Sequence, residues 1–588
     1  MKDFIKFVFA TVVGIIIFCV GGFFLSLLML FSIAWSSDSE TQVPEKSVLK
    51  LDFNGTLSER GSEDLPFAAL LGDDTSNYTL RDVLSAIGKA KENESIAGIY
   101  IEADMLGTGY ASLKSIRDAL LDFRESGKFV VAYADNYTQG LYYLSSVADK
   151  VMLNPRGVIQ WRGLSATPMF YKELLDKLGV EMQVFRVGTY KSAVEPFVAT
   201  EMSDANRQQI ETYLKSVWGT VTNEVAASRG LTVEQLNACA DRMLMFYPAQ
   251  ESVTAGLADT LIYKNDVRDY LEARVGLDED DDLSLLSLAD MAGVAKNQPK
   301  DKSGNVVAVY YASGEIDGTQ GEGSEYIDSE EMAADLRRLK EDEDVRAVVL
   351  RVNSPGGSAY GSEQIWYAVS ELKKEKPVIV SMGDYAASGG YYLSCCADTI
   401  VAEPTTLTGS IGIFGLYPNV QGLTEKIGLD FDVVKTNRFA DFGTPGRPLN
   451  ADESSLMQMM VNEGYDLFLE RCAQGRGMTK EEVDKVGQGR VWTGADALGL
   501  GLVDELGGLD RALEIAVEKA GVEHYTLMSY PAPRPFLESL KRISPTRFMG
   551  ARLLPEEASG LYRMAKQLHE MEPRERLQAR LPFELNVR

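Results

Sequence analysis

The sequence has very few histidines, the residues that serve most often as general bases in enzymes. Only His524 and His569 occur among 588 residues, and both lie in the last 65 positions. Metal-binding cysteine spacing is also missing, because the five cysteines form no C-x-x-C pair. We therefore predict no bound metal and no cofactor. The adjacent Cys395 and Cys396 are interpreted as small buried hydrophobic residues.

Positive charge is scarce relative to negative charge. The chain has 59 Lys and Arg against 86 Asp and Glu, which gives a formal net charge of −27 at pH 7. Nucleic acids are bound by a basic face, so the composition argues against a nucleic-acid partner. Solubility is the simplest explanation of the acidity. The length and the ordinary hydrophobic fraction of 45% predict two or more globular domains.

Only one long hydrophobic run is present, and it lies at the N-terminus. The 29 positions of residues 7–35 carry no charge and are rich in Phe, Ile, Leu and Val. A membrane-spanning helix needs about 20 apolar residues, whereas the apolar part of a cleavable signal peptide has about 7–15. Lys2 and Lys6 precede the run, and Asp38 and Glu40 follow it. The positive-inside rule therefore predicts a single-pass protein with a cytoplasmic N-terminus and an extracytoplasmic body.

The body of the chain is an internal duplication. YYLSSVADKVMLNP at 142 matches YYLSCCADTIVAEP at 391, and KLGVEMQV at 177 matches KIGLDFDV at 426, both offset by 249. A third block, around Tyr110 and Tyr360, is offset by 250. Three blocks in one order at nearly one offset indicate two copies of a domain, because the period is far too long for a solenoid repeat.

Within each copy, short β-branched runs alternate with amphipathic segments. In the second copy, residues 345–352 and 376–383 are typical of buried strands, and residues 362–376 are typical of an amphipathic helix. This alternation predicts a parallel α/β domain with right-handed crossovers. The predicted organisation is a cytoplasmic tip with its anchor, a first repeat, an acidic and polar linker, a second repeat and a peripheral tail, at residues 1–45, 46–265, 266–304, 305–525 and 526–588.

Ser388 lies among small residues in GDYAASGGYYLSCCAD, a setting that suits a nucleophile in need of room. At the offset of 249, Ser388 aligns with Gln139, and Lys191 aligns with Ala440. The two positions are 52 residues apart in both copies, as an ancestral Ser–Lys pair would be if each copy kept a different half. Lys191 alone could be one of many surface lysines, whereas the reciprocal loss favours a functional role.

A Ser–Lys dyad is chemically coherent. Serine is a weak nucleophile and needs an adjacent base. A lysine with its free pKa of about 10.4 is protonated at neutral pH, but burial disfavours the charged form and lowers that pKa. A buried Lys191 would accept the proton of Ser388 and later give it to a leaving amine.

Three small-residue turns complete the candidate site. VNSPGGSAYG places Gly356 and Gly357 directly after a strand, and Gly389 follows Ser388. The amides of these glycines are predicted to form an oxyanion hole, although a plain β-turn is the alternative for SPGG. Ser410, in TLTGSIGIFG, could hydrogen-bond the lysine amine, and a turn serine that satisfies its own backbone is an equal alternative.

The SPGG turn, the ASGGYY serine, the TGSIG turn and the GTYKSA lysine resemble the signal peptide peptidase A family, membrane-bound serine proteases of the ClpP/crotonase-like superfamily. The duplicated layout with an N-terminal anchor resembles the long form of that family over roughly residues 1–525. The resemblance implies an α/β fold of two tandem duplicated ClpP/crotonase-like domains after an N-terminal transmembrane helix. It also implies a nucleophile, a general base, a lysine-orienting serine and oxyanion-binding glycines, respectively Ser388, Lys191, Ser410, and Gly356, Gly357 and Gly389.

The same resemblance implies a bowl-shaped homotetramer in the bacterial inner membrane, with a periplasmic body that degrades signal-peptide remnants or other short apolar peptides. Two alternatives stay open. A non-catalytic membrane scaffold of the same fold would have been indicated by the loss of Ser388 or Lys191. A crotonase-type acyl-CoA enzyme would not need a Ser–Lys pair, and an extracytoplasmic body would not meet acyl-CoA. The sequence leaves open whether the dyad forms within one chain or between chains.

Overall fold

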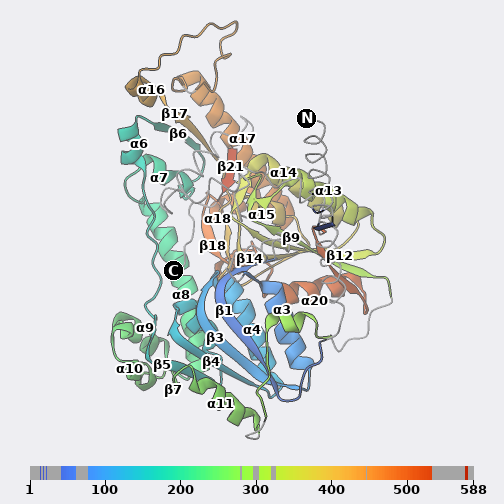
Figure 1. Cartoon of the computed structure of the whole chain (residues 1–588). Helices are drawn as coiled ribbons and strands as arrows, with labels where there is room; N and C mark the ends of the chain where they lie inside the picture. Colours follow the sequence, from blue (N-terminus) through green and yellow to red (C-terminus); the bar gives the residue numbers. More distant parts are fainter. Residues whose placement is uncertain are drawn as a thin grey trace, which may run out of the picture.

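The computed structural model describes most of the chain after the N-terminal segment (Figure 1). The residues described are 41–60, 77–277, 281–295, 303–318, 326–444, 446–532, the strand β21 (Leu577–Arg580), and positions 14, 18, 21 and 22. Apart from those last four positions, the anchor predicted at residues 7–35 lies outside the described residues. Within the described part of the chain, no helix is both long and apolar enough to span a bilayer. The transmembrane helix therefore stays a prediction.

The N-terminal copy is built on a parallel sheet whose strand order is β2-β1-β3-β4-β5-β7, with β8 beside β1. Buried Val, Ile and Leu side chains occupy the inner strands, as expected where helices cover a parallel sheet. The strands are β1 (Ser47–Ser58), β2 (Asn77–Thr79), β3 (Ile96–Gly107), β4 (Phe129–Tyr137), β5 (Lys150–Ile159), β7 (Thr260–Leu261) and β8 (Leu285–Leu286).

The C-terminal copy repeats this plan in the order β18-β16-β14-β12-β9-β20, with β15 joining β14 to β19. Strands β12 and β14 and helix α14 confirm the two strands and the helix predicted at residues 345–383. The elements are β9 (Val306–Ser313), β12 (Val345–Ser354), α14 (Ala359–Lys373), β14 (Val378–Ala387), β15 (Thr399–Ala402), β16 (Leu407–Gly409), β18 (Val491–Thr493), β19 (Glu505–Leu506) and β20 (Thr526–Tyr530).

Helices recur in the same order in both copies, which agrees with the predicted duplication. The long helices α8 and α17 have 26 residues each, and both begin at a side-chain cap. The pairs are α3 (Leu80–Glu92) with α13 (Ser329–Glu341), α4 (Tyr110–Glu125) with α14, α5 (Gln139–Ser145) with α15 (Gly389–Ser394), α6 (Lys172–Leu178) with α16 (Gln421–Ile427), α8 (Asp204–Arg229) with α17 (Ala451–Arg476), α9 (Val233–Asp241) with α18 (Lys480–Val486), α10 (Ala249–Thr254) with α19 (Gly494–Gly499), and α11 (Asp266–Val275) with α20 (Leu509–Ala520).

A third, smaller sheet draws strands from both copies. Its order is β11-β10-β13-β21-β17-β6, so a strand of the N-terminal copy closes a sheet of the C-terminal copy. Figure 1 shows β6 and β17 side by side in the upper part of the molecule. The bounds are β6 (Glu181–Arg186), β10 (Glu315–Ile316), β11 (Tyr326–Ile327), β13 (Gly356–Ser358) and β17 (Phe414–Asn419).

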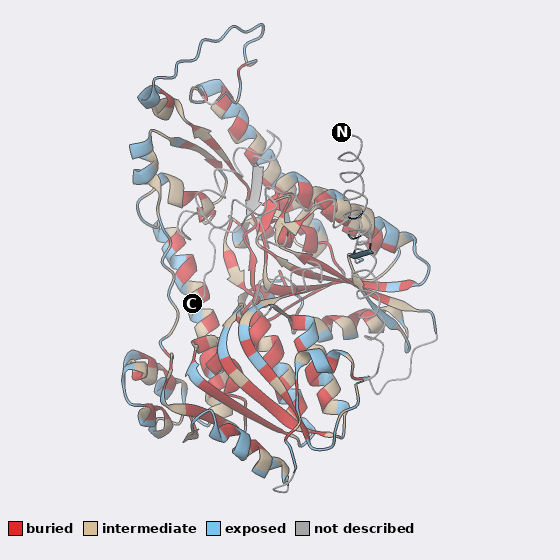
Figure 2. Ribbon diagram, in the orientation of Figure 1, coloured by how far each residue is buried: buried red, intermediate tan, exposed pale blue. Residues whose placement is uncertain are grey.

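Buried residues follow the strands and the inward faces of the helices (Figure 2). Two segments outside the predicted repeats join these cores. In the stretch expected as a linker, Val267 and Leu271 of α11 are buried against the N-terminal sheet, and β8 pairs with β1. In the expected tail, β20 lies parallel to β9. The few apolar residues of the acidic stretch at residues 266–304 are thus enough to add a strand and a helix to the N-terminal copy.

Candidate active site

The structure brings Ser388 and Lys191 into direct contact within one chain. Lys191 Nζ lies 2.8 Å from Ser388 Oγ, and 3.0 Å from both the hydroxyl and the carbonyl oxygen of Ser410. None of the three residues has exposed surface. The lysine of the N-terminal copy therefore reaches the serine of the C-terminal copy without a second chain.

Burial lowers the pKa of Lys191 well below 10.5, because the ammonium loses its hydration. Among the described residues, the hydrogen-bond partners of Nζ are serine oxygens and no carboxylate that would favour the charged form. A neutral amine has two N–H donors and one lone pair. The two donors match the two oxygens of Ser410, which leaves the lone pair for the hydroxyl proton of Ser388.

Ser388 occupies the turn between β14 and α15 in an unfavourable backbone conformation. Its φ of 55° and ψ of −112° are rare for a residue with a Cβ and cost on the order of 1–3 kcal/mol. Its N–H donates to the carbonyl of Gly409, and its carbonyl accepts from the N–H of Tyr392, both at 2.8 Å. Backbone hydrogen bonds on both sides therefore hold the main chain of this turn in place.

Lys191 is delivered by β6, which pairs antiparallel with β17 from Arg186 opposite Phe414 to Glu181 opposite Asn419. Neighbouring glycines leave room for the lysine side chain. A Cβ on Gly489 would lie 2.6 Å from Lys191 Cβ, and a Cβ on Gly412 would lie 3.2 Å from Lys191 Cδ. Both glycines lie in loops of the C-terminal copy. That copy therefore leaves space for Lys191, which belongs to the N-terminal copy.

The three candidate oxyanion glycines take two different positions. Gly356 lies against Gly389, since a Cβ on Gly389 would lie 3.1 Å from Gly356 Cα. The N–H of Gly356 donates to Ser354 Oγ at 3.2 Å. Gly357 faces β10, where an added Cβ would lie 2.2 Å from the carbonyl oxygen of Ile316. Gly356 and Gly389 therefore lie against each other beside the nucleophile, whereas Gly357, the next residue of β13, packs against β10.

Ser410 also has a positive φ, of 51°, directly after β16. Its N–H donates to the carbonyl of Arg490 at 2.7 Å, which fixes the turn. The structure thus turns its hydroxyl to the lysine amine, the first of the two arrangements considered for this serine.

Sequence reasoning missed a buried polar network behind the lysine. Ser192 Oγ donates to Asn206 Oδ1 at 2.9 Å, and Gln209 Nε2 donates to Ser192 Oγ at 2.8 Å and to the carbonyl of Tyr190 at 3.1 Å. Asn206 and Gln209 lie three residues apart on the buried face of α8. The inward face of an amphipathic helix is normally apolar, so two amide side chains on that face of α8 were the feature of the sequence that could have revealed this network.

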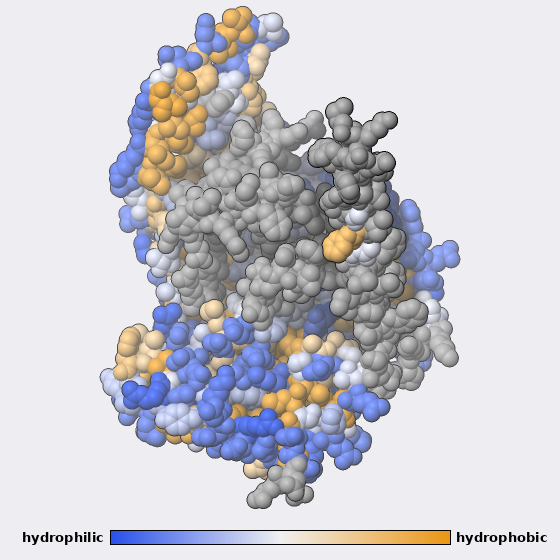
Figure 3. Space-filling model, viewed as in Figure 1, coloured by the Kyte–Doolittle hydropathy of each residue, from blue (hydrophilic) through white to orange (hydrophobic). Residues whose placement is uncertain are grey.

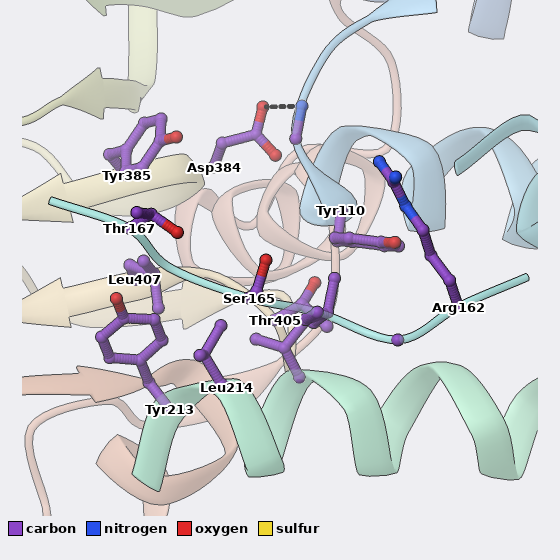
Figure 4. A pocket seen from close by; sticks show the side chains of 14 residues that line it. Tyr110, Arg162, Ser165, Thr167, Tyr213, Leu214, Asp384, Tyr385, Thr405 and Leu407 are labelled. Atoms are coloured by element: carbon purple, nitrogen blue, oxygen red, sulfur yellow. Dashed lines mark hydrogen bonds between the residues drawn. The ribbon is translucent and has the colours of Figure 1, made fainter. Parts of the chain in front are cut away.

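A cavity of about 380 Å³ lies between the two copies (Figure 4). Tyr385 and Leu407, on the strands that lead towards Ser388, line one part of it, and neither Ser388 nor Lys191 is among its lining residues. Asp384, also in its wall, accepts hydrogen bonds from the N–H of Gly109 at 3.3 Å and from Ser112 Oγ at 2.7 Å. Burial raises the pKa of Asp384. The cavity is therefore a junction between the copies and lies apart from the dyad.

Known proteins resemble this chain over most of its length. The model of peptidase family S49 matches residues 122–278 and 370–523, one segment in each copy and together more than half of the chain. Protease 4 of Salmonella typhi is 36% identical over 528 residues, which cover 86% of this chain and 84% of that protein. Protease 4 of Haemophilus influenzae is 36% identical over 510 residues, with coverages of 84% and 82%. The chloroplastic serine protease SPPA of Arabidopsis thaliana is 31% identical over 506 residues, with coverages of 85% and 72%. The chain therefore belongs to peptidase family S49 and is a serine endopeptidase.

Proposed function

We propose that this chain is a membrane-anchored endopeptidase in which Ser388 is the nucleophile and Lys191 the general base, and that it degrades cleaved signal peptides and similar short apolar peptides. The observation that carries the proposal is the 2.8 Å contact between Lys191 Nζ and Ser388 Oγ, in a setting where burial favours the neutral amine. Geometry and protonation state both suit a serine activated by a lysine.

In the proposed reaction, Ser388 Oγ attacks the peptide carbonyl carbon while its proton moves to Lys191 Nζ. The resulting ammonium then gives the proton to the leaving amine as the peptide C–N bond breaks. A water molecule attacks the acyl-enzyme ester with the same lysine as base, and the acid product leaves. General base catalysis of this kind contributes about 10²–10⁴ in rate.

The negative charge that develops on the carbonyl oxygen needs hydrogen-bond donors. The amides of Gly356 and Gly389 are proposed as these donors, because the two glycines lie against each other beside Ser388. The N–H of Gly356 would exchange its 3.2 Å bond to Ser354 Oγ for the oxyanion. Gly357 supports this arrangement through its pairing with β10. Loss of one such donor costs about 10²–10³ in rate in other enzymes.

We further propose that each copy has the ClpP/crotonase-like fold, and that residues 7–35 anchor the chain in the bacterial inner membrane with the body in the periplasm. Support comes from the 29-residue uncharged run and from the basic residues before it. The first described strand begins at Ser47, so few residues of the sequence separate the proposed anchor from the body. A site at the membrane surface would meet apolar peptides where they are released.

A homotetramer is proposed from the way the copies interlock. In the N-terminal copy, β6 docks on β17 of the other copy. The equivalent segment of the C-terminal copy, residues 430–435, is exposed and unpaired, with Val434 98% exposed. Figure 3 shows apolar side chains gathered at the upper left, where α6 and α16 lie. The same docking repeated from chain to chain would cover this segment and close a ring.

The experiment that tests the proposal is hydrolysis of an apolar signal-peptide substrate by the full chain in detergent. Wild type is compared with Ser388→Ala, Lys191→Ala and a mixture of the two variants. Both variants are expected to be inactive. The mixture is expected to stay inactive as well, because Ser388 and Lys191 of one chain already meet each other.

A matched control is Lys215→Ala, which removes an exposed lysine of α8 whose ion pair with Glu211 spans 3.6 Å. That variant is expected to keep wild-type activity. Near-wild-type activity of Lys191→Ala would show that the base lies elsewhere and would overturn the dyad. Activity restored in the mixture would place the functional dyad across chains.

A further inference from the structure

Lys191 lies in a turn between two regular elements, so other groups have to fix its direction. Strand β6 ends at Arg186, and a short 3₁₀ helix begins at Ser192, directly after the lysine. The lysine side chain is a flexible four-carbon stem. A misplacement of about 1 Å at a reacting group can cost about 10²-fold in rate. The main chain on both sides of Lys191 therefore decides whether the amine reaches Ser388.

The side-chain amide of Gln209, on α8, binds both neighbours of Lys191. Its Nε2 donates to the carbonyl of Tyr190 at 3.1 Å and to Ser192 Oγ at 2.8 Å. Its Oε1 accepts from the N–H of Val491 at 3.3 Å. Gln209 has no exposed surface. One buried amide thus holds the two residues that flank the lysine and the first residue of β18 in the other copy.

Val491 connects this amide to Ser410. The residue before it, Arg490, accepts the N–H of Ser410 on its carbonyl oxygen at 2.7 Å. Ser410 in turn offers its hydroxyl and carbonyl oxygens to the lysine amine. Through two consecutive residues of the C-terminal copy, the Gln209 amide therefore fixes the lysine main chain relative to the serine that receives its amine.

Further hydrogen bonds fix the direction of the amide itself. Gln209 Nε2 lies 3.0 Å from Asn206 Oδ1, and Asn206 Nδ2 donates to Glu195 Oε2 at 2.9 Å. Glu195 Oε1 accepts from Ser203 Oγ, at the start of α8, at 2.6 Å. Gln209, Asn206 and Glu195 are all buried. The Gln209 amide is therefore part of a connected network and does not rotate freely.

The corresponding helix of the C-terminal copy lacks this amide. Helices α8 and α17 begin after the caps Ser203 and Asn450, and the sixth residue after the cap is Gln209 in α8 and Leu456 in α17. Leu456 is 44% exposed. The segment before α17 carries Ala440 in place of the lysine. The buried amide therefore occurs in the copy that supplies the lysine.

We propose that Gln209 is a positioning residue, whose amide keeps Lys191 in line with Ser388 by fixing the main chain on both sides of the lysine. The proposal rests on the proposed function, since it takes Lys191 as the general base. The amide binds the neighbours of the lysine, so it acts through Lys191. Its loss is expected to slow proton transfer from Ser388 and to leave binding of the peptide unchanged.

The test is steady-state hydrolysis of an apolar signal-peptide substrate by the full chain in detergent, with kcat and KM measured separately. Gln209→Met keeps the length of the side chain and removes its donors and its acceptor. The kcat of this variant is expected to fall about 10–10²-fold at unchanged KM. A wild-type kcat in Gln209→Met, or a raised KM at unchanged kcat, would overturn the proposal.

Gln208→Met is the matched control, because it makes the same change at the next position of α8. Gln208 is exposed, and its Oε1 accepts from the ring hydroxyl of Tyr190 at 3.3 Å. It therefore contacts the same tyrosine without holding its main chain. Gln208→Met should keep the wild-type kcat. An equal loss of kcat in the two methionine variants would assign the effect to α8 as a whole and overturn the role of Gln209.

Gln209→Glu distinguishes positioning from a general defect in folding. A protonated carboxyl group donates one hydrogen bond and accepts others, whereas a carboxylate only accepts. The variant can therefore hold the carbonyl of Tyr190 while its new carboxyl group is protonated, and burial extends that state to higher pH. Its kcat, divided by that of wild type at the same pH, should approach 1 at low pH and fall reversibly as pH rises.

The ratio of the two kcat values isolates the new carboxyl group. The charged side chains around the network, those of Arg186, Glu195 and Arg490, are present in both proteins. Their titration therefore cancels when the two proteins are compared at each pH. A loss of kcat in Gln209→Met, together with a ratio for Gln209→Glu that stays constant between about pH 5 and 9, would indicate a structural defect and overturn the proposal.

Lys191→Met, measured in the same series, separates this proposal from the proposed function. An active Lys191→Met would overturn the dyad, and the positioning role would fall with it. If Lys191→Met is inactive while Gln209→Met keeps the wild-type kcat, the dyad stands and only the role of Gln209 is overturned. A loss of kcat in both variants, with the pH-dependent ratio in Gln209→Glu, supports both.

Discussion

The two copies are built alike, yet they differ in backbone strain at the turn from β4 to α5 and from β14 to α15. In the N-terminal copy, Gln139, which aligns with Ser388, begins α5 without a positive φ, and the Oγ1 of Thr138 before it accepts from the N–H of Leu141. In the C-terminal copy, Ser388 has a φ of 55° and makes no side-chain cap. Both turns connect the same elements, so folding does not require the strain. The strained form is found only where the serine faces a lysine, as expected for a functional constraint.

The residue that replaces the serine shows what the N-terminal copy does instead. Gln139 Oε1 accepts from the N–H groups of Arg162 and Gly163 at 3.0 and 2.9 Å, and its Nε2 donates to Tyr110 Oη at 2.9 Å. Tyr110 and Gly163 line the cavity between the copies. A position that carries a candidate nucleophile in one copy thus connects helix α4 to the loop at residues 162–163 in the other.

The lysine segments differ in the reciprocal way. The N-terminal copy inserts the segment that ends at Lys191 into the other copy, whereas the aligned position in the C-terminal copy, Ala440, is exposed. In neither copy do the described residues of this segment pair with a strand of the copy to which they belong. Within one chain only the first segment finds a neighbouring copy with which to pair. One serine and one lysine, in different copies, then suffice for one complete site.

The largest expected effect comes from removing the lysine that joins the copies. Lys191→Met keeps the length of the side chain but not the amine, so activity should fall about 10²–10⁴-fold. Wild-type activity should fall as pH decreases through the lowered pKa of Lys191, because a protonated amine cannot accept the serine proton. Peptide hydrolysis across a pH series measures both effects.

The same variant should unfold less readily. In the wild type, the unfolded chain binds a proton at Lys191 up to pH 10.5 while the folded chain does not, so stability rises with pH in that range. Lys191→Met removes this dependence and should be the more stable protein at neutral pH, as measured by urea denaturation. If the stability of wild type and of Lys191→Met depended on pH in the same way, the buried amine would be charged, and the contrast between the copies would lose its chemical basis.

The second prediction concerns a buried carboxyl at the junction. Burial raises the pKa of Glu403 from 4.5 to about 7, and its Oε1 accepts from Ser115 Oγ of the other copy at 2.8 Å. The folded chain holds this proton above pH 4.5 and the unfolded chain does not. Stability should therefore fall between about pH 4.5 and 7, by up to about 3 kcal/mol.

Glu403→Gln should remove that fall, because the amide stays neutral at every pH. The measurement is urea denaturation at pH 5 and pH 8. Glu481→Gln, at an exposed position of α18, serves as the control and should keep the wild-type pH dependence. An unchanged pH dependence in Glu403→Gln would show that the junction does not hold a protonated carboxyl.

Much of the fold follows from the sequence because its signals are local or repeated. The β-branched runs at β12 and β14 predict strands, and the offset of 249 predicts two copies. The offset also pairs Ser388 with Lys191, since it exposes a reciprocal loss that neither residue shows alone. Whether the lysine acts as a base stays a prediction until the variants are measured.

Long-range docking was beyond the reach of the sequence. Strands β6 and β17 belong to different copies and are far apart in the sequence. The local pattern of residues 181–186 does not indicate with which strand they pair. The four residues of β21 likewise carry no signal that they pair with β13. Buried amides such as Gln209 contradict the helix pattern locally and make sense only once Lys191 lies beside them.

A smaller effect is expected when the N-terminal copy loses Gln139. Gln139→Ala leaves the N–H of Gly163 and the hydroxyl of Tyr110 without that amide, which should cost about 1–3 kcal/mol of stability. Activity should stay at the wild-type level, because the residue does not contact the dyad. Gln250→Ala, at an exposed position of α10, should change stability by less than about 0.5 kcal/mol. A loss of activity in Gln139→Ala would show that the contacts of Gln139 also support the dyad.

The smallest expected effect comes from removing the hydroxyl of Ser410, which orients Lys191 but does not itself accept the proton of Ser388. Ser410→Gly removes the hydroxyl 3.0 Å from Lys191 Nζ, and glycine accepts the φ of 51° without strain. One hydrogen bond is worth about 1 kcal/mol, so kcat should fall about fivefold while KM stays unchanged. The hydroxyl oxygen also stabilises the ammonium form, so its loss should move the acidic limb of the pH profile to lower pH. Ser410→Ala lacks the same hydroxyl but keeps the strained backbone. Equal losses of kcat in the two variants would assign the effect to the hydroxyl. A wild-type kcat and pH profile in Ser410→Gly would instead show that the carbonyl of residue 410 holds the lysine.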